Sequence, residues 1–370
     1  MSFSVTTARI LTSLLFIFSG LVKAIDPKGL AYKMQEFFEA WSSSGFLPGM
    51  MNSFGEHALI FSVIMITLEV MVGVALLIGW QKKITAWILL LLMLFFTFLT
   101  SYVLFTGKIR ACGCFGDCIR LTPVQTFTKD IILLLLSLFI LINIKYVRPI
   151  AKPFFSALYM IGALLLILFL QWYVLRNLPL ADCLPYKKGN NILELRKMPS
   201  NAIADKFDYV FVYEKNGLKQ EFTSDKIPDS TWSFVDRKQT LVQKGSNNIT
   251  LINDFSLSTE SGSDSTVDVL STTGEYYILF EADPTSFSSG WKEDVELTKR
   301  INTKGKKIFI VTAQPGKVKA HFGSQLIGIP LLTCDATVLK TIARVDPTLY
   351  LMNGPVVKEK LGPNSFEKIE

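Results

Sequence analysis

Five apolar stretches constrain this chain more than any other feature of its sequence. An α-helix needs about 20 residues to cross the hydrocarbon core of a membrane, and the fourth stretch needs some extension to reach that length. Because lipid offers the backbone no hydrogen-bond partners, such stretches are stable there as helices. The sequence therefore predicts five membrane spans near residues 8–25, 57–80, 84–105, 129–144 and 154–175.

The composition divides the chain into a membrane half and a soluble half. Half of all residues are hydrophobic, and the excess is concentrated in the first 175 residues. The first span resembles a secretory signal, but it lacks a small-x-small cleavage site and four more spans follow it. The net charge of +7 includes no basic tract interleaved with aromatic residues, so nothing in the sequence favours nucleic-acid binding.

Positive charges in the short loops predict the orientation. Lys82 and Lys83 lie between the second and third spans, and Lys145, Arg148 and Lys152 lie between the fourth and fifth. Loops of this kind face the cytoplasm. We therefore expect a bacterial inner-membrane protein with a cytoplasmic N-terminus and a periplasmic soluble half. Lipid and a periplasmic protein would be its partners, and disulfides persist in that compartment.

Three cysteines lie within seven residues of the loop between the third and fourth spans: Cys112, Cys114 and Cys118. Flanking basic residues would lower the pKa of at least one thiol, whereas Asp117 would act in the opposite direction. The glycines in this loop would let the backbone bend tightly enough to bring sulfurs together. Because the thiolate is the form that attacks disulfides, the loop predicts thiol–disulfide exchange.

The sequence does not determine which cysteines are bonded to each other. A Cys112–Cys114 bond would close a small, strained ring, so we expect Cys114–Cys118 with Cys112 as the exchanging thiol. Cys183 follows the fifth span by about eight residues and could resolve a bond to Cys112. The alternatives are a structural disulfide, or a zinc site that needs a fourth ligand from Cys183 or a histidine.

Glu69 lies near the middle of the second span. A charge at that depth is costly unless it faces a partner or a water-filled cavity, which makes it a candidate functional residue. The alternative is a buried ion pair with Lys23 or Arg9 of the first span. If the site is functional, Arg9, Lys23 and Glu69 are candidates for binding a quinone that enters the bundle from the lipid.

A family resemblance covers residues 1–147. It is carried by Arg9, by the segment Ser19-Gly20-x-x-Lys23-x-x-Asp26-Pro27, by Glu69 with Gly73, and by Cys112-Gly-Cys-Phe-Gly-Asp-Cys118. These residues resemble the four-helix membrane domain of the DoxX and MauE families, which are associated with thiol and quinone redox processes. The bundle of those families is similar in outline to that of disulfide-forming enzymes such as vitamin K epoxide reductases. The third cysteine and the lack of a plain Cys-x-x-Cys depart from those enzymes.

The resemblance implies a four-helix domain at 1–147 and a fifth helix within 148–176. Beyond it, residues 177–273 alternate short strand-like runs with turn-forming residues. We expect this region to be β-rich and to form an insert or a partner surface. Its expected strands lie at 209–213, 232–235 and 249–252.

Residues 274–370 predict an α/β domain. The expected elements are strands at 276–280 and 307–312, helices at 291–301 and 336–343, and a hairpin of strands 348–352 and 356–358. The stretch 345–354 resembles the part of the thioredoxin fold in which a cis-proline precedes a strand, which implies a cis Pro347. The region 281–291, where thioredoxins carry their dithiol, contains no cysteine.

Two functions are therefore compatible with the sequence. In the first, the protein is an oxidoreductase that exchanges disulfides through its cysteine loop, presents substrates on a thioredoxin-like domain and passes electrons to a carrier near Glu69. In the second, it is a non-catalytic scaffold or docking subunit of an envelope complex, held by structural disulfides. Cys334 would have a separate role, or the C-terminal domain would have lost thiol chemistry altogether.

Overall fold

The computed structural model describes residues 2–109, 113, 115–119, 121–243, 245–248, 250–282, 291–326 and 328–369. Within these ranges, five helices are long and apolar enough to cross a membrane, as predicted. The fourth begins at Pro123, six residues before the predicted start. The five helices are α1 (Ser2–Ala24), α4 (Ala58–Ile78), α5 (Lys82–Thr106), α6 (Pro123–Ile142) and α7 (Pro153–Arg176).

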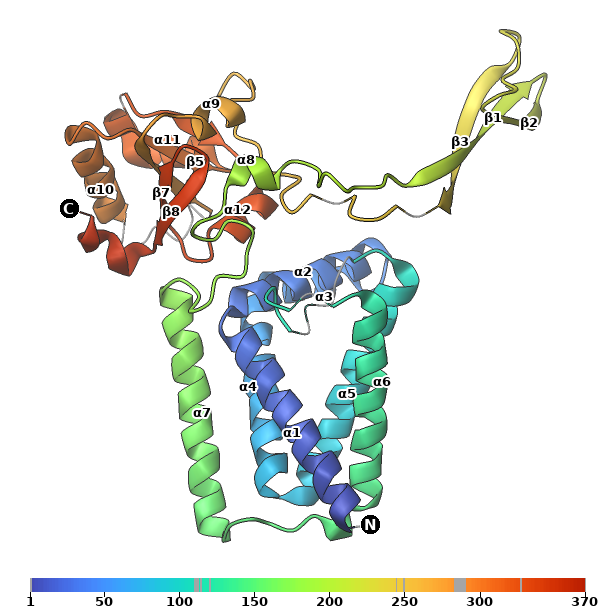
Figure 1. Ribbon diagram of the computed structural model, residues 1–370, viewed down its shortest axis with the longest axis vertical. Coiled ribbons are helices and arrows are strands. Elements are labelled where there is room, and N and C mark those ends of the chain that lie inside the picture. Colours follow the sequence, from blue (N-terminus) through green and yellow to red (C-terminus); the bar gives the residue numbers. More distant parts are fainter. Residues whose placement is uncertain are drawn as a thin grey trace.

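Helices α1, α4, α5 and α6 lie side by side as a bundle, and α7 stands beside them (Figure 1). Gln171 of α7 donates a hydrogen bond to Thr67 of α4 at 2.9 Å. The α5–α6 loop and the soluble half lie at one end of the bundle, and the N-terminus lies at the other (Figure 1). The structure thus places the cysteine-bearing loop and the soluble half on the same side of the spans.

Two glycines allow α1 and α4 to approach closely. A Cβ atom on Gly20 would lie 2.5 Å from Val70 Cγ2, and one on Gly73 would lie 2.8 Å from Ile17 Cγ1 and 3.0 Å from the Ile17 nitrogen. Small residues at a helix contact let the backbones pack tightly in lipid, where no hydrophobic force drives helices together. The Gly73 that follows Glu69 by one turn therefore has a packing role.

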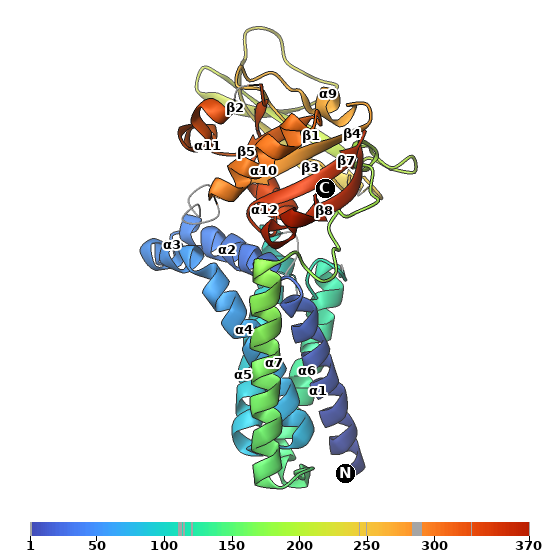
Figure 2. The ribbon, with the colours of Figure 1, turned by 90° about the vertical axis from the view of Figure 1, so that its left-hand side faces the viewer.

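Side-chain caps set the starts of two helices. Thr122 accepts a hydrogen bond from the Gln125 nitrogen, and Gln125 accepts one from the Thr122 nitrogen, which forms a complete capping box before Pro123. Asp26 caps α2 (Pro27–Ser43) by accepting from the Gly29 nitrogen at 3.0 Å. Helices α2 and α3 (Pro48–Glu56) lie across the end of the bundle beneath the soluble half (Figure 2).

The soluble half contains a five-stranded sheet in the order β6-β5-β4-β7-β8. Strand β4 is parallel to β5 and antiparallel to β7, which forms the predicted hairpin with β8. The Asp346–Pro347 peptide bond is cis, as predicted. The strands are β4 (Glu275–Glu281), β5 (Ile308–Thr312), β6 (Leu331–Thr333), β7 (Thr348–Asn353) and β8 (Val356–Leu361).

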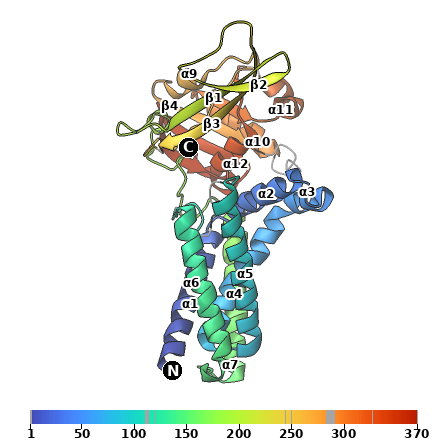
Figure 3. The ribbon, with the colours of Figure 1, turned by 90° about the vertical axis from the view of Figure 1, so that its right-hand side faces the viewer.

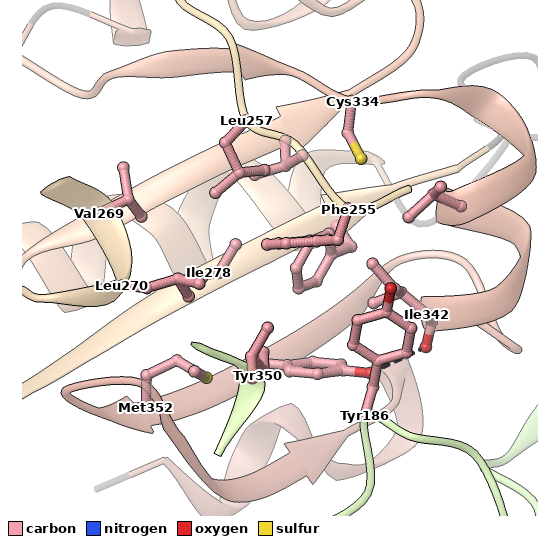
Figure 4. Packing of buried hydrophobic residues seen from close by; sticks show 14 of the residues in the cluster. Tyr186, Phe255, Leu257, Val269, Leu270, Ile278, Cys334, Ile342, Tyr350 and Met352 are labelled. Carbon is pink, nitrogen blue, oxygen red and sulfur yellow. Dashed lines mark hydrogen bonds between the residues drawn. The ribbon is translucent and has the colours of Figure 1, made fainter. Parts of the chain in front are cut away.

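Hydrophobic clusters on both faces bury this sheet. Tyr276, Ile278 and Leu279 of β4 have no exposed surface, which is typical of a strand covered on two sides. One cluster includes Phe255 and Tyr350 (Figure 4), and the other lies against the predicted helix α10 (Trp291–Thr303). Short elements of the soluble half are α8 (Ile192–Leu195), α9 (Thr266–Leu270), α11 (Pro315–Phe322), α12 (Ala336–Ile342) and 3-10 turns at Gly323–Leu326 and Pro363–Lys368. A further 3-10 turn, Ile144–Tyr146, lies in the link between α6 and α7.

A separate three-stranded antiparallel sheet has the order β2-β1-β3. It stands away from the five-stranded sheet on two connecting segments (Figure 1) and lies in front of that sheet in the view of Figure 3. Its strands are β1 (Lys206–Lys215), β2 (Leu218–Thr223) and β3 (Ser233–Gln243). The predicted strand at 209–213 is confirmed within β1, and the predicted strand at 232–235 is confirmed over 233–235, because β3 begins at Ser233.

The predicted strand at 249–252 is wrong over its described residues 250–252, which form no strand. Ile252 is nevertheless buried, and its nitrogen donates to the Leu195 carbonyl at 3.1 Å. Its side chain belongs to the same cluster as Phe255 and Leu257, which covers one face of the five-stranded sheet. The apolar residues there are explained by packing of a loop against the sheet.

Candidate functional site

A disulfide joins Cys118 of the α5–α6 loop to Cys183, which follows α7, and their Cα atoms are 4.9 Å apart. The predicted Cys114–Cys118 bond is therefore wrong, because the Cys118 sulfur is bonded elsewhere. The segment after α7 returns over the mouth of the bundle and brings Cys183 to the loop across a sequence separation of 65. Cys112 and Cys114 lie outside the described residues, so their predicted roles stay predictions.

The disulfide lies in a depression between the membrane half and the soluble half. Two glycines of the loop, Gly113 and Gly116, have positive φ angles of 72° and 58°, which favour glycine and give the loop its tight bend. A Cβ on Gly113 would lie 3.2 Å from Lys33 Cγ of α2. The polar residues that line the depression are Lys23, Asp26, Lys33, Asp117 and Asp182.

An aspartate directly precedes each bonded cysteine, and each aspartate is paired with a cation from the soluble half. Arg344 Nη2 lies 2.9 Å from Asp117 Oδ2, and Lys360 Nζ lies 2.6 Å from Asp182 Oδ2. Arg344 Nε also lies 2.8 Å from Asp26 Oδ2, at the junction of α1 and α2. The soluble half thus contacts both chain segments that carry the disulfide.

Burial at this junction shifts two pKa values. It raises the pKa of Asp26, against the opposing effects of Arg344 and the Gly29 N–H group. It also lowers the pKa of Lys360, against the opposing effect of Asp182. In both groups desolvation outweighs the attraction of the partner charge, which is common for buried ion pairs. The desolvation cost of burying these charges therefore offsets much of the attraction between them.

Within the bundle, Lys23 Nζ and Glu69 Oε2 form an ion pair at 2.7 Å, with 6% and 3% of their side chains exposed. Lys23 also lies 5.2 Å from the centre of the Phe96 ring. Arg9 does not join this pair: its Nη1 donates to the Arg148 carbonyl at 2.8 Å, in the link between α6 and α7. The structure brings together two of the three predicted quinone-binding residues.

Asp130 of α6 is a further buried charge that the sequence analysis missed. Its Oδ1 lies 2.6 Å from Lys129 Nζ, and its side chain is 1% exposed. Among the described residues, its Oδ2 accepts no hydrogen bond. The signal was available, since Asp130 lies inside an apolar stretch, but Lys129 beside it marked the expected start of the span, whereas the helix begins at Pro123.

Lys23, Glu69 and Asp130 line one cavity. The cavity lies at the end of the bundle next to the cysteine loop, and Phe115 of that loop forms part of its wall. Lys129 Nζ lies 5.0 Å from the centre of the Phe115 ring. The lining combines charged and apolar side chains, including Lys23, Glu69, Met93, Phe96, Phe115, Lys129 and Asp130. The cavity therefore connects the buried ion pairs of the bundle to the loop that carries Cys118.

Cys334 is unbonded in the described structure and lies in the core of the soluble half, beside Phe255 (Figure 4). Burial raises its pKa to about 11 from an ordinary value of 9.0. A buried thiol with a raised pKa is a poor nucleophile. Its surroundings are those of a structural cysteine, separate from the disulfide.

We expect Cys334 in the folded protein to react with iodoacetamide at pH 8 at least about a hundredfold more slowly than in urea, because two pKa units lower its thiolate fraction by about that factor. Its stabilising effect on the fold is complete below about pH 9 and is lost as the pH rises through about 11. Mass spectrometry of alkylated peptides across this pH range measures both trends. Equal rates in folded and unfolded protein would contradict a buried thiol.

The structure so far defines a membrane protein with five candidate spans and a mixed α/β soluble region that contains two sheets. Residues 1–143 match the family described as "Methylamine utilisation protein MauE". The membrane bundle is thus similar to this family over less than half of the chain. Residues 207–244, which include most of β1 and all of β2 and β3, match a "Domain of unknown function (DUF8463)".

A curated relative shares part of the sequence. "Protein TlpB" of Flavobacterium psychrophilum is 32% identical over 145 residues, which cover 37% of this chain and 36% of that protein. The match thus spans about a third of the relative's length. No solved structure matches the chain.

Proposed function

We propose that this protein is a membrane thiol–disulfide exchange protein that acts through its cysteine loop. The observation that carries the proposal is the Cys118–Cys183 bond in the depression at the mouth of the bundle. The bond lies beside a cavity with buried charges, and two further cysteines precede Cys118 in the same loop. A bond used only to brace the structure would need neither feature.

The proposed exchange begins with a reduced dithiol on a partner protein. One partner thiolate attacks a sulfur of the Cys118–Cys183 bond, which forms a mixed disulfide and releases the other cysteine as a thiolate. The second partner thiolate then breaks the mixed disulfide. The partner leaves as a disulfide, and Cys118 and Cys183 hold the two electrons as thiols once the protons have been taken up.

Re-oxidation of this pair needs a two-electron acceptor, for which we propose a membrane quinone. Such a group would oxidise the two thiols to a disulfide and would itself be reduced to a quinol. The side chains that line the cavity suit such a group chemically. Because the enclosed space holds about one water molecule, a quinone ring would enter only if the lining side chains moved apart. Phe96, Phe115 and Met93 offer apolar surface for a planar ring, and the unpartnered Asp130 Oδ2 is a buried polar atom within the same lining. Lys23 and Asp130 would hold or move protons there.

The soluble half would bind the partner protein and hold it near the cysteine loop. Its sheet order, the hairpin and the cis Pro347 support a thioredoxin-like domain, and the absence of cysteine from 281–291 supports loss of its own exchange chemistry. The exposed aromatic and apolar side chains of the three-stranded sheet, such as Phe234, provide further contact surface. We place this half in the periplasm of a bacterium, opposite the basic loops.

The Cys183→Ser variant tests the exchange in its reverse direction. Its Cys118 thiolate attacks the disulfide of an oxidised partner, which forms a mixed disulfide and releases one partner thiolate, and no Cys183 thiol is present to break that mixed disulfide. We expect dithiothreitol-sensitive adducts of higher mass on non-reducing gels of acid-quenched membranes. The double variant Cys118→Ser/Cys183→Ser should lose the adducts that form through Cys118, and Cys334→Ser serves as the matched control that retains the native bond.

A scaffold remains the alternative function, since the same bond fastens the segment after α7 to the bundle. In that case Cys183→Ser would form no adduct, would lower only stability or assembly, and the wild-type bond would stay fully oxidised under all growth conditions. That combination of results would overturn the exchange proposal.

A further inference from the structure

The two cysteine-bearing segments share a pattern that the exchange chemistry does not explain. Asp117 precedes Cys118 and Asp182 precedes Cys183, and both aspartates pair with cations of the soluble half. The two cations come from different elements: Arg344 follows α12, whereas Lys360 lies in β8. Two elements of the soluble half therefore bind the residues that directly precede the two bonded cysteines.

Both cations also have contacts within the soluble half. Arg344 donates from Nη1 to the Lys340 carbonyl at 2.9 Å, and its side chain is 5% exposed. Lys360 lies 5.0 Å from the centre of the Tyr350 ring, and its side chain is 8% exposed. Because these contacts within the soluble half restrict the two side chains, they reduce the conformational entropy that is lost when the ion pairs form.

Covalent geometry explains why such positioning matters. A disulfide forms only when the two Cα atoms lie within about 4.4–6.8 Å of each other. The Cys118 segment is a loop between two spans, and the Cys183 segment is an irregular link between α7 and α8. Once the bond is reduced, the segments stay in register only if other contacts hold them. The two ion pairs supply such contacts at the neighbouring residues.

We propose that Arg344 and Lys360 are positioning residues that hold the reduced Cys118 and Cys183 thiols in register, so that the soluble half acts as a clamp on the disulfide. Reactive groups held in register reform a bond with a higher effective concentration. The clamp therefore shifts the equilibrium toward the oxidised form. This inference concerns the bond itself and is independent of whether a partner protein exchanges with it.

The test measures that equilibrium in the full-length protein in detergent. A Cys112→Ser/Cys114→Ser/Cys334→Ser background leaves one cysteine pair, which is equilibrated with reduced and oxidised glutathione, quenched with acid and counted with a maleimide mass tag. We expect Arg344→Met and Lys360→Met each to lower the equilibrium constant for bond formation about tenfold, which corresponds to about 30 mV for a two-electron couple. Lys319→Met, which removes an exposed ion pair with Glu260, should leave it unchanged.

Two further variants separate positioning from damage to the soluble domain. Asp117→Asn and Asp182→Asn remove the same ion pairs from the segments that carry the cysteines, so they should reproduce the shift without altering the core of that domain. Arg344→Lys retains the charge and should recover part of the loss. An equilibrium constant within twofold of the parent in the Arg344→Met/Lys360→Met double variant would overturn the clamp. The exchange proposal would still be tested separately, by its adducts with partner proteins.

Discussion

Replacing Lys23 with methionine is expected to destabilise the membrane half by about 3–5 kcal/mol, because it leaves the Glu69 carboxylate buried without its cation. The two side chains are 2.7 Å apart and almost fully enclosed, so water cannot take the place of the ammonium group. Thermal unfolding in detergent, followed by circular dichroism at matched protein concentration, measures the loss.

The double variant Lys23→Met/Glu69→Leu distinguishes a broken ion pair from a packing defect. Removing both charges avoids the uncompensated carboxylate, so the double variant should be more stable than Lys23→Met alone. Lys319→Met is the exposed control and should cost about 0–1 kcal/mol, since its pair with Glu260 is about half exposed on each side. A Lys23→Met protein as stable as the control would contradict the buried pair.

Replacing Gly73 with leucine is expected to separate α1 from α4 and to cost about 1–3 kcal/mol or more, because overpacking forces backbone shifts. The nearest neighbours include the Ile17 nitrogen at 3.0 Å, which a change of side-chain rotamer cannot move. Unfolding measured as for Lys23→Met reports the cost.

Gly162 provides the matched control for this substitution. It lies in α7, and an added Cβ would meet nothing within 4 Å. Gly162→Leu should therefore leave stability within about 0.5 kcal/mol of the wild type. If both glycine variants behave alike, the close contact between α1 and α4 is wrong.

The Lys23–Glu69 pair and Gly73 differ in their relation to the proposed function. The Lys23–Glu69 pair lies in the lining of the cavity that Phe115 closes from the loop side, whereas Gly73 lies at a helix contact. Loss of exchange in Gly73→Leu would therefore follow from loss of the bundle. Loss of exchange in Glu69→Gln with an intact fold would instead support a role for the cavity in electron or proton transfer.

Much of the membrane half follows from the sequence because its determinants are local. A run of apolar residues long enough to cross lipid must be helical whatever surrounds it, which is why all five spans were predicted. The capping signal at Thr122 and the hairpin turn at Asn353-Gly354 are local in the same sense. The predicted strand at 249–252 failed because its apolar residues are buried by a loop, a choice that a short run of sequence does not encode.

The sequence by itself determined five spans, the location of a cysteine loop between two of them, and a soluble α/β half on the same side of the membrane. Only the tertiary structure decided that Cys118 bonds to Cys183, that Lys23 and not Arg9 meets Glu69, and that Arg344 and Lys360 approach the disulfide. The physical reason is distance along the chain. Contacts across 46 to more than 200 residues depend on how helices and domains pack, and residue spacing carries no record of that packing.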